Sequence, residues 1–540
     1  MLHIVNTLLV FLLLTVPTGI FLGEMPADGW AGFLACLLVV WVLFKHKRLA
    51  LPIAAVSGWL GLILLTLWRG DDYLRAAAAI VMAMAALMWI AGRNLASQRE
   101  VILDAFALGT VCGALSNAAA GIIQFAGVPA WLDGWVYQSQ GIVNGHFAQA
   151  NNFASFVLFG AASIFWLLLR KKIAGFVALL LALPMAVALS LTTSRTMLLI
   201  LSAWILMAVL LMRLQPANRK IWGGIALFGL SVFCGQWLVA EMGWSNANAL
   251  ARTEIGGAHN VRLQYWHQAW MLITEKPWFG WGLGHYGFQQ WQQVSNGQFP
   301  VTIDEGVTSH CHNFILQVLA EYGIAGLMCV TAMLIPVAGS IWKNRNDPAF
   351  AFVAFLSGAV LIHSLLEFPL WYTVFLMPFC LLWGLVDQSR CTTVSFGSNR
   401  QWAFFFLVFV LMFWGGAWLA MGKLEKYFTP PQETAQRIAA TRELSKAGMH
   451  PMLHYMSDVA LSNYLVADNL FGEQKEVLLL QLWQFRPFPL LMLKMAMIDY
   501  ASGDLIKAKQ WIDVLKQTNP RFMSKALEMY PAYKPVIDLM

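Results

Sequence analysis

Thirteen apolar runs, each close to the length that a membrane-spanning helix needs, limit the fold of this chain more than any other feature. About 20 mostly apolar residues cross the ~30 Å hydrocarbon core as a helix. Strands of a membrane barrel would instead be ~10-residue segments of alternating polarity, and these runs are continuous. We therefore expect an all-α, polytopic membrane helix bundle. The runs lie near residues 4–22, 29–44, 50–68, 76–92, 101–127, 147–169, 173–190, 196–213, 221–240, 313–342, 349–366, 370–386 and 402–421.

The composition excludes several other classes of protein. Hydrophobic residues make up 59% and charged residues 12% of the 540 residues, whereas about 25% are charged in an average soluble protein. The seven cysteines are scattered, without CxxC or metal-ligand spacing. A nucleic-acid binder, a disulfide scaffold and a disordered chain are therefore disfavoured. The first run lacks a preceding basic segment, so we expect a first span and not a cleaved signal peptide.

The basic residues between the runs predict the orientation of the chain. The loops that follow the even-numbered runs carry fifteen Lys and Arg residues, and those that follow the odd-numbered runs carry six. Because cytoplasmic loops are enriched in Lys and Arg, we expect the N-terminus in the cytoplasm. An odd number of spans then places the residues after 422 outside, in the periplasm of a Gram-negative cell.

This topology suggests two domains. Residues 1–422 form a transmembrane domain, which includes a large outer loop at 241–312, and residues 423–540 form a soluble α-helical domain. The second domain has one stretch with roughly tetratricopeptide spacing, although a generic helical hairpin is the favoured explanation of a single such stretch. The residues of this stretch are Ala496, Tyr500, Gly503, Ala508 and Pro520.

Two arginines on the outer side are candidate anion ligands. Arg195 stands at the junction of the seventh and eighth runs, and Arg262 lies in the large outer loop. A guanidinium offers a fork of donors that matches phosphate. The alternatives are interfacial snorkelling for Arg195 and an ordinary amphipathic helix for Arg262.

Two histidines precede the tenth run, at His310 and His312. A metal site is disfavoured, because no further Cys or His lies at ligand spacing. His312 is expected at the positive end of a helix dipole, which opposes protonation, so we interpret His312 as a candidate general base. Asn313, Gln317 and Glu321 recur every fourth residue and predict a polar stripe that faces the bundle interior.

Further polar residues are expected on the same outer side. His363 and Glu367 lie one helical turn apart, and they either contact substrate or brace each other. Gln149, Asn151 and Asn152, at the start of the sixth run, carry amides that suit sugar hydroxyls, and hydrogen bonds between helices are an equally good explanation. Together these groups fit transfer from a lipid pyrophosphate, in which arginines neutralise the leaving group and a base activates a hydroxyl.

At this point the sequence resembles the O-antigen ligase and polymerase superfamily, and within it the PglL-type bacterial O-linked oligosaccharyltransferases. The resemblance covers residues ~145 to ~540. It rests on SRT at 194–196, PWFGWGLG at 277–284, HNFILQVLAEYGIAGL at 312–327, HFAQANNFASFVLFG at 146–160 and HSLLEFPLWY at 363–372.

The resemblance implies a multi-pass inner-membrane enzyme with features of the glycosyltransferase-C fold and a periplasmic active site. Such an enzyme moves a preassembled glycan from undecaprenyl pyrophosphate to a Ser or Thr hydroxyl of a periplasmic acceptor protein such as a pilin, with inversion and without a metal or other cofactor. It also implies that His312 is the essential histidine and that Arg195 and Arg262 hold the pyrophosphate. The role of His310 beside His312 stays open.

Other functions stay open as well. A lipopolysaccharide O-antigen ligase would use the same donor with a lipid A core acceptor, and an O-antigen polymerase would not obviously need residues 423–540. A lipid or polysaccharide transporter is disfavoured because we find no repeated halves, which many transporters have. A purely structural membrane scaffold is less favoured still.

Overall fold

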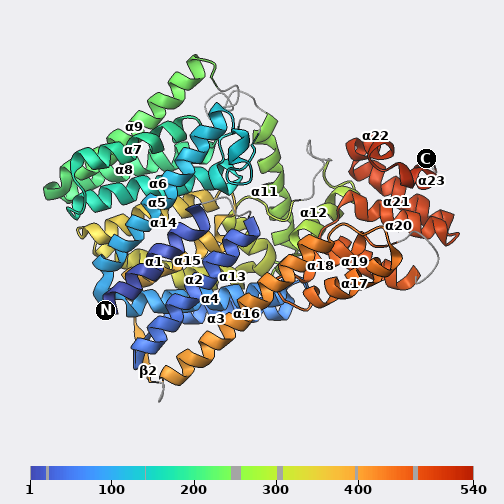
Figure 1. Ribbon diagram of the computed structural model, residues 1–540, viewed down its shortest axis with the longest axis horizontal. Coiled ribbons are helices and arrows are strands. Elements are labelled where there is room, and N and C mark those ends of the chain that lie inside the picture. Colours follow the sequence, from blue (N-terminus) through green and yellow to red (C-terminus); the bar gives the residue numbers. More distant parts are fainter. Residues whose placement is uncertain are drawn as a thin grey trace. The chain divides into compact units, whose positions relative to one another are not determined.

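The computed structural model describes residues 2–19, 24–139, 142–244, 257–300, 308–395, 399–465 and 472–538 (Figure 1). Its apolar helices coincide with the thirteen predicted runs. They are α1 (Leu2–Gly19), α2 (Glu24–Lys45), α3 (Ile53–Arg69), α4 (Arg75–Asn94), α5 (Arg99–Ala126), α6 (Ala150–Leu169), α7 (Gly175–Ser190), α8 (Arg195–Leu214), α9 (Arg219–Glu241), α13 (Phe314–Lys343), α14 (Pro348–Ser364), α15 (Thr373–Val386) and α16 (Asn399–Tyr427).

The prediction of an all-α polytopic bundle is confirmed. Within the described residues, eight helices are long and apolar enough to cross a membrane, and five further apolar helices are shorter. The number of thirteen spans therefore stays a prediction. The remaining described α-helices are α11 (Gly257–Glu275), α12 (Tyr286–Ser295), α17 (Thr434–Gly448), α18 (His454–Ser462), α19 (Gly472–Phe485), α20 (Pro489–Ala501), α21 (Leu505–Thr518), α22 (Pro520–Met529) and α23 (Lys534–Ile537).

The chain forms two compact units. Unit 1 consists of Met1–Leu60, Val81–Ala258 and Cys329–Val410, and unit 2 of Gly61–Ile80, His259–Met328 and Leu411–Met540. We describe the two units separately.

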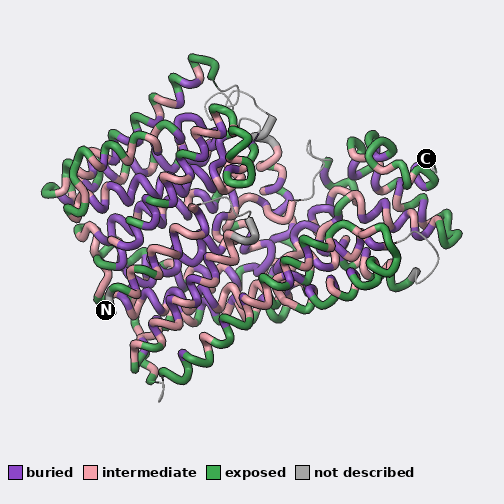
Figure 2. The backbone as a smooth tube through the Cα atoms, viewed as in Figure 1, coloured by how far each residue is buried: buried purple, intermediate pink, exposed green. Residues whose placement is uncertain are grey.

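The core of unit 1 is built from α5, α6, α14 and α15, where the buried residues gather (Figure 2). Every residue of α15 is buried. Small residues let helix backbones meet, as is common between membrane helices. A methyl group at Gly92 of α4 would lie 2.3 Å from the carbonyl oxygen of Leu381 in α15, and one at Gly384 would lie 2.1 Å from that of Trp89. These glycines therefore fix how closely α4 and α15 pack.

Loops of unit 1 with the same predicted sidedness contact one another. On one side, strand β1 (Arg48–Pro52) pairs antiparallel with β2 (Cys391–Ser395), and Arg99 forms a 2.9 Å ion pair with Asp347. These segments follow the second, twelfth, fourth and tenth runs. On the other side, the Thr373 hydroxyl donates to the Asp28 carbonyl at 2.7 Å, which links the segment after the first run to the start of the twelfth. Each contact joins segments that the basic residues predict on one side, and the orientation itself stays a prediction.

In unit 2, a glycine-rich loop packs on a kink in α13. The kink lies at Gly323, whose φ is 63° and ψ is −161°. Residues 277–284 run along it: the Trp281 amide donates to the carbonyl of Ala320 at 2.9 Å, and the Gly282 amide donates to that of Glu321 at 2.8 Å. Methyl groups at Gly280 and Gly323 would lie 2.4 Å from backbone carbonyl carbons of the opposite segment. The PWFGWGLG motif therefore forms a backbone-to-backbone contact with the kink of α13, and only glycine permits so close an approach.

The C-terminal helices of unit 2 form hairpins. Gly503, with a φ of 86°, makes the turn between α20 and α21. The core of these helices also contains Tyr73, from the turn between α3 and α4, and Trp291 of α12. The Tyr73 hydroxyl donates to Asp458 Oδ2 at 2.9 Å. The helices from α19 onward therefore share an apolar core with Tyr73 and Trp291. The helices α17 and α18 pack with α16 in a second core, and α11 packs with Tyr286 and Ala320 in a third.

Candidate functional site

The polar residues of unit 1 form a cluster at the N-terminal ends of α6 and α8. Ser194 caps α8, and its hydroxyl accepts from the Met197 amide at 3.3 Å. The same hydroxyl donates to Asn151 Oδ1 at 2.7 Å, and Asn151 Nδ2 donates to Glu367 Oε1 at 3.0 Å. Arg195, the next residue after Ser194, begins α8. We call Asn151, Ser194 and Glu367 with the adjoining Arg195 the amide cluster.

The other predicted residues of unit 1 support this cluster. Gln149 caps α6, because its Oε1 accepts from the Asn152 amide at 3.0 Å. Asn152 is buried, and so is His363. The Nδ1 atom of His363 lies 3.0 Å from the Ser155 hydroxyl, one turn further along α6. His363 and Glu367 thus both contact α6, instead of only bracing each other.

A tight turn precedes Gln149 and is held by two buried amides of α5. Gln124 Oε1 accepts from the amides of Asn144 at 2.9 Å and Gly145 at 2.8 Å, and Asn117 Oδ1 accepts from the His146 amide at 2.9 Å. Ala148 completes the turn with a φ of 54°, in the left-handed region that non-glycine residues adopt infrequently. Burial lowers the pKa of His146 to about 4, so the turn carries a neutral imidazole.

In unit 2, His312 lies in a strained turn directly before α13. Its φ is 55°, and such a conformation costs about 1–3 kcal/mol unless the surroundings enforce it. Its ring stacks on Tyr265 of α11, with centroids 6.0 Å apart and planes 17° apart. Arg262 lies three residues before Tyr265 in α11, and residues three apart share one helix face. The structure therefore brings Arg262 and His312 to the same face of α11.

The neighbouring His310 is in a different environment. Its Nδ1 lies 2.8 Å from the Ser309 hydroxyl, and the Thr308 hydroxyl donates to its carbonyl at 2.8 Å. Burial above all, followed by the positive charge of Arg486 and the proximity of His312, lowers the pKa of His310 to about 3. His310 is therefore neutral at every physiological pH.

The predicted polar stripe on α13 holds the surrounding loops. Asn313 Oδ1 accepts from the amides of Ile315 and Leu316, at 3.1 and 3.2 Å. Gln317 accepts from the Cys311 amide at 2.8 Å and donates to the Ser309 carbonyl at 3.3 Å. Glu321 Oε1 accepts from the Gly284 amide at 2.9 Å. Each member of the stripe therefore fixes a backbone segment close to His312 or to the glycine-rich loop.

The predicted residues thus fall into two sets. Unit 1 brings together Gln149, Asn152, Arg195, His363 and Glu367 around the start of α6. Unit 2 brings together Arg262, His310, His312, Asn313, Gln317 and Glu321 around the start of α13. Part of the predicted outer loop, at 245–256 and 301–307, lies outside the described residues.

Several residues of these sets were not singled out from the sequence as site residues. Ser155, Tyr265 and Arg486 gave no distinctive signal, because a serine or tyrosine in a helix and an arginine in a soluble domain are ordinary. Asn117 and Gln124 did carry a signal. They are amides in an apolar run, seven residues apart, which places them on one helix face.

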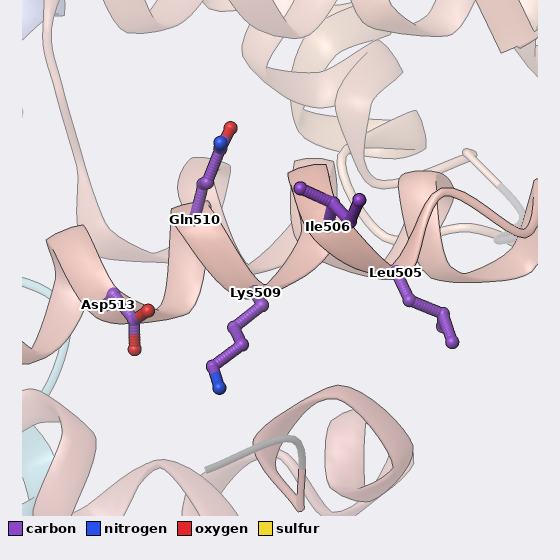
Figure 3. Close-up of a pocket in the computed structure, with 5 residues that line it drawn as sticks. All are labelled: Leu505, Ile506, Lys509, Gln510 and Asp513. Carbon is purple, nitrogen blue, oxygen red and sulfur yellow. The ribbon is translucent and has the colours of Figure 1, made fainter.

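Two other features lie apart from these sets. Within the described ranges, no group of three or more His, Cys, Asp or Glu side chains is arranged to hold a metal ion. A shallow depression of about 450 Å³ lies along α21, lined by Leu505, Ile506, Lys509, Gln510 and Asp513. Figure 3 shows these side chains spreading from one helix. It has no histidine and one carboxylate, so the acid–base chemistry expected of the chain is not located there.

Two protein families match the chain. The family described as O-antigen ligase matches residues 177–331, and the family described as virulence factor membrane-bound polymerase, C-terminal, matches residues 352–522. The first stretch contains Arg195, Arg262 and His312. The second contains His363 and Glu367 and extends into α22.

Two proteins of Acinetobacter baylyi are similar in sequence. A general O-oligosaccharyltransferase is 25% identical over 260 residues, which are 45% of this chain and 43% of that protein. A ComP-specific O-oligosaccharyltransferase is 31% identical over 133 residues, which are 24% of this chain and 23% of that protein. The chain therefore matches less than half the length of either relative.

Proposed function

Because the chain belongs to the O-antigen ligase superfamily, we propose that it is a PglL-type O-oligosaccharyltransferase. It moves a preassembled glycan in one step from undecaprenyl pyrophosphate to a Ser or Thr hydroxyl of a periplasmic acceptor protein, such as a pilin. The similarity to two O-oligosaccharyltransferases supports the reaction class, and one observation supports the choice of base: His312 is held in a left-handed turn, stacked on Tyr265.

In the proposed reaction, the acceptor oxygen attacks the anomeric carbon of the glycan, and the bond from that carbon to the pyrophosphate oxygen breaks. His312 accepts the hydroxyl proton as the new bond forms. The electron pair leaves with the pyrophosphate, so negative charge develops on the leaving group. A single displacement inverts the anomeric centre. A positioned base typically contributes ~10²- to 10⁴-fold to the rate of such a step.

Arg195 and Arg262 hold the pyrophosphate in this proposal. Arginine is well suited to this role, because its charge is permanent and its donors match phosphate oxygens. Neutralising the leaving group lowers the barrier, since the transition state carries more charge there than the ground state. The amides of Gln149 and Asn152 and the side chains of His363 and Glu367 line or support the glycan and acceptor sites. No metal or other cofactor takes part.

We further propose that the protein lies in the bacterial inner membrane with a cytoplasmic N-terminus. Residues 1–422 form the transmembrane catalytic domain, with the outer loop 241–312, and residues 423–540 form a periplasmic α-helical domain. The contacts between loops of equal predicted sidedness in unit 1 support this topology. The lipid tail of the donor explains why the enzyme is embedded in the membrane.

A second candidate is a lipopolysaccharide O-antigen ligase, which the description of the family matched at 177–331 favours. Its donor and chemistry are the same, but the acceptor is the lipid A core. Deleting the gene separates the two candidates. Loss of pilin glycosylation with an intact O-antigen ladder supports the protein acceptor, and the reverse result supports the ligase.

Intact-mass measurement of a co-expressed pilin tests the proposed function directly. Wild-type protein should add the mass of one complete glycan, and His312→Ala should add none. His310→Gln is the matched control, since it replaces the neighbouring imidazole and leaves the proposed base in place. Glycosylated pilin from cells with well-expressed His312→Ala would overturn the assignment of the base. Unmodified pilin from cells with the wild-type protein and the donor would contradict the reaction itself.

A further inference from the structure

Arg486, at the end of α19, carries a positive charge to the loop that contains the proposed base. Its guanidinium lies over the rings of Tyr455 and Phe485, with centroids 5.5 and 5.4 Å away. Its charge also acts on His310, two residues before His312. All of these residues belong to unit 2. A charged residue of the C-terminal helices is therefore near enough to act electrostatically on the loop before α13.

The contacts of Phe485 fix this position independently. Its ring packs against Tyr73 and Tyr455, with centroids 5.5 and 4.8 Å apart. A methyl group at Gly284 would lie 3.2 Å from the Phe485 ring. Gly284 in turn donates its amide to Glu321 of α13. The end of α19 is thus held against the glycine-rich loop, which itself packs on the kink of α13.

The surroundings of Arg486 are neutral. Its contacts are aromatic rings and a hydrogen bond to the Tyr455 side chain. Its Nε is buried without a hydrogen-bond partner, and no carboxylate forms an ion pair with it in the part of the chain that the structure describes. Arg486 is partly buried, and a guanidinium whose Nε is shielded from water is stabilised by an anionic partner. An oxyanion at this place would supply that charge.

The available oxyanion is the donor itself. We propose that Arg486 is a third ligand of the donor pyrophosphate, contributed by the C-terminal helices to the site that contains His312 and Arg262. This inference rests on the proposed function. It gives the C-terminal helices a role in binding the donor, in addition to any role in recognising the acceptor protein.

The test compares variants of the full-length protein in lipid nanodiscs. Equilibrium binding of undecaprenyl pyrophosphate and the KM for a donor with a neutral glycan are measured for wild type, Arg486→Gln and Arg486→Lys. We expect Arg486→Gln to weaken binding and raise the KM about tenfold or more. Arg486→Lys should recover part of the loss, because it restores the charge but not the planar fork.

A matched control separates donor binding from a structural role. Arg437→Gln removes another arginine of the C-terminal helices, whose Nη2 donates to the Tyr464 carbonyl at 3.4 Å, and it should leave KM and binding unchanged. Inorganic pyrophosphate should inhibit Arg486→Gln less than wild type. A donor with an acidic glycan should show no larger effect than the neutral one, because the ligand is the pyrophosphate and not a sugar carboxylate.

Two results would overturn the inference. One is wild-type binding and KM in Arg486→Gln. The other is a fall in kcat and melting temperature in Arg486→Gln, with unchanged donor binding and no recovery in Arg486→Lys. That result would show that Arg486 only stabilises the packing of the aromatic rings. If the wild-type protein transfers no glycan, the proposed function fails, and the binding of undecaprenyl pyrophosphate still decides whether Arg486 is an anion ligand.

Discussion

The two sets of polar residues are built by different means. In unit 1, the amide cluster is held by side chains that bond to each other at the ends of α6 and α8. In unit 2, His312 is held by backbone, because Gln317 and Glu321 bind main-chain amides and glycines allow two segments to touch. A side-chain network tolerates replacement by groups with equivalent donors and acceptors. A backbone contact without room for Cβ does not.

The largest effect is expected from Gly323→Ala, because this change disrupts the backbone contact in unit 2. Gly323→Ala would place a methyl group 2.4 Å from the Trp278 carbonyl carbon at a φ of +63°, and such strain costs more than the usual 1–3 kcal/mol. We expect at least about a hundredfold loss of glycan transfer, or a failure to yield folded protein. Size-exclusion profiles and pilin glycosylation measure both outcomes.

Gly339→Ala is the matched control for this prediction. Gly339 lies in the same helix, α13, and its added methyl group would have no heavy atom within 4 Å apart from its chain neighbours and the local helix backbone. It should behave as wild type. Equal activity of the two variants would show that the glycine-rich loop does not need its close contact with the kink.

The next effect compares one arginine from each unit. Arg195→Gln and Arg262→Gln should each raise the KM for the donor about tenfold to a hundredfold, because each removes charge-assisted hydrogen bonds to the pyrophosphate. Steady-state kinetics with the lipid-linked donor measure this. A raised KM in only one of the variants would mean that the other arginine serves its own unit and not the donor.

A smaller effect is expected from the side-chain network in unit 1. Asn151→Asp loses the donor to Glu367 and places two carboxylates in contact, which should lower the melting temperature by several degrees and the rate by about tenfold. Adding Glu367→Gln should restore most of both, since the new amide donates to the new carboxylate. If the double variant does not recover, the hydrogen bond between residues 151 and 367 does not determine the stability and rate of the protein.

The smallest effect concerns pH. In the folded protein the pKa of His146, in unit 1, is about 4 and that of His310, in unit 2, is about 3. Both are below the usual value of about 6.5, so the unfolded state binds more protons between these values. Stability is therefore complete above pH 6.5 and falls as the pH is lowered towards 4.

Melting temperatures at pH 7.5 and 5.0 test this expectation. His146→Gln and His310→Gln should each reduce the loss at pH 5.0 by a few degrees. His267→Gln, at an exposed position of α11, is the control and should leave the loss unchanged. If neither His146→Gln nor His310→Gln reduces the fall in melting temperature at pH 5.0, other titratable groups cause the loss of stability in acid.

Local sequence patterns predicted the elements of the fold but not the partners of the polar residues. The apolar runs predicted each helix of the bundle, because a spanning helix satisfies its own backbone and needs only length and polarity. The interpretation of Asn313, Gln317 and Glu321 as a stripe was also local. The partner of Glu321 is the Gly284 amide, 37 residues away, and no periodicity indicates a contact over that separation.

The sequence by itself determined the all-α architecture of long apolar helices and the motifs that resemble the O-antigen ligase superfamily, since hydrophobic run length and short motifs are properties of contiguous residues. Only the tertiary structure distinguished His310 from His312, brought Tyr265 to the imidazole and carried Arg486 to the same loop. These outcomes depend on which segments pack together. Burial, which sets the pKa of His310, and close backbone approach, which glycine permits, exist only after the helices have come together.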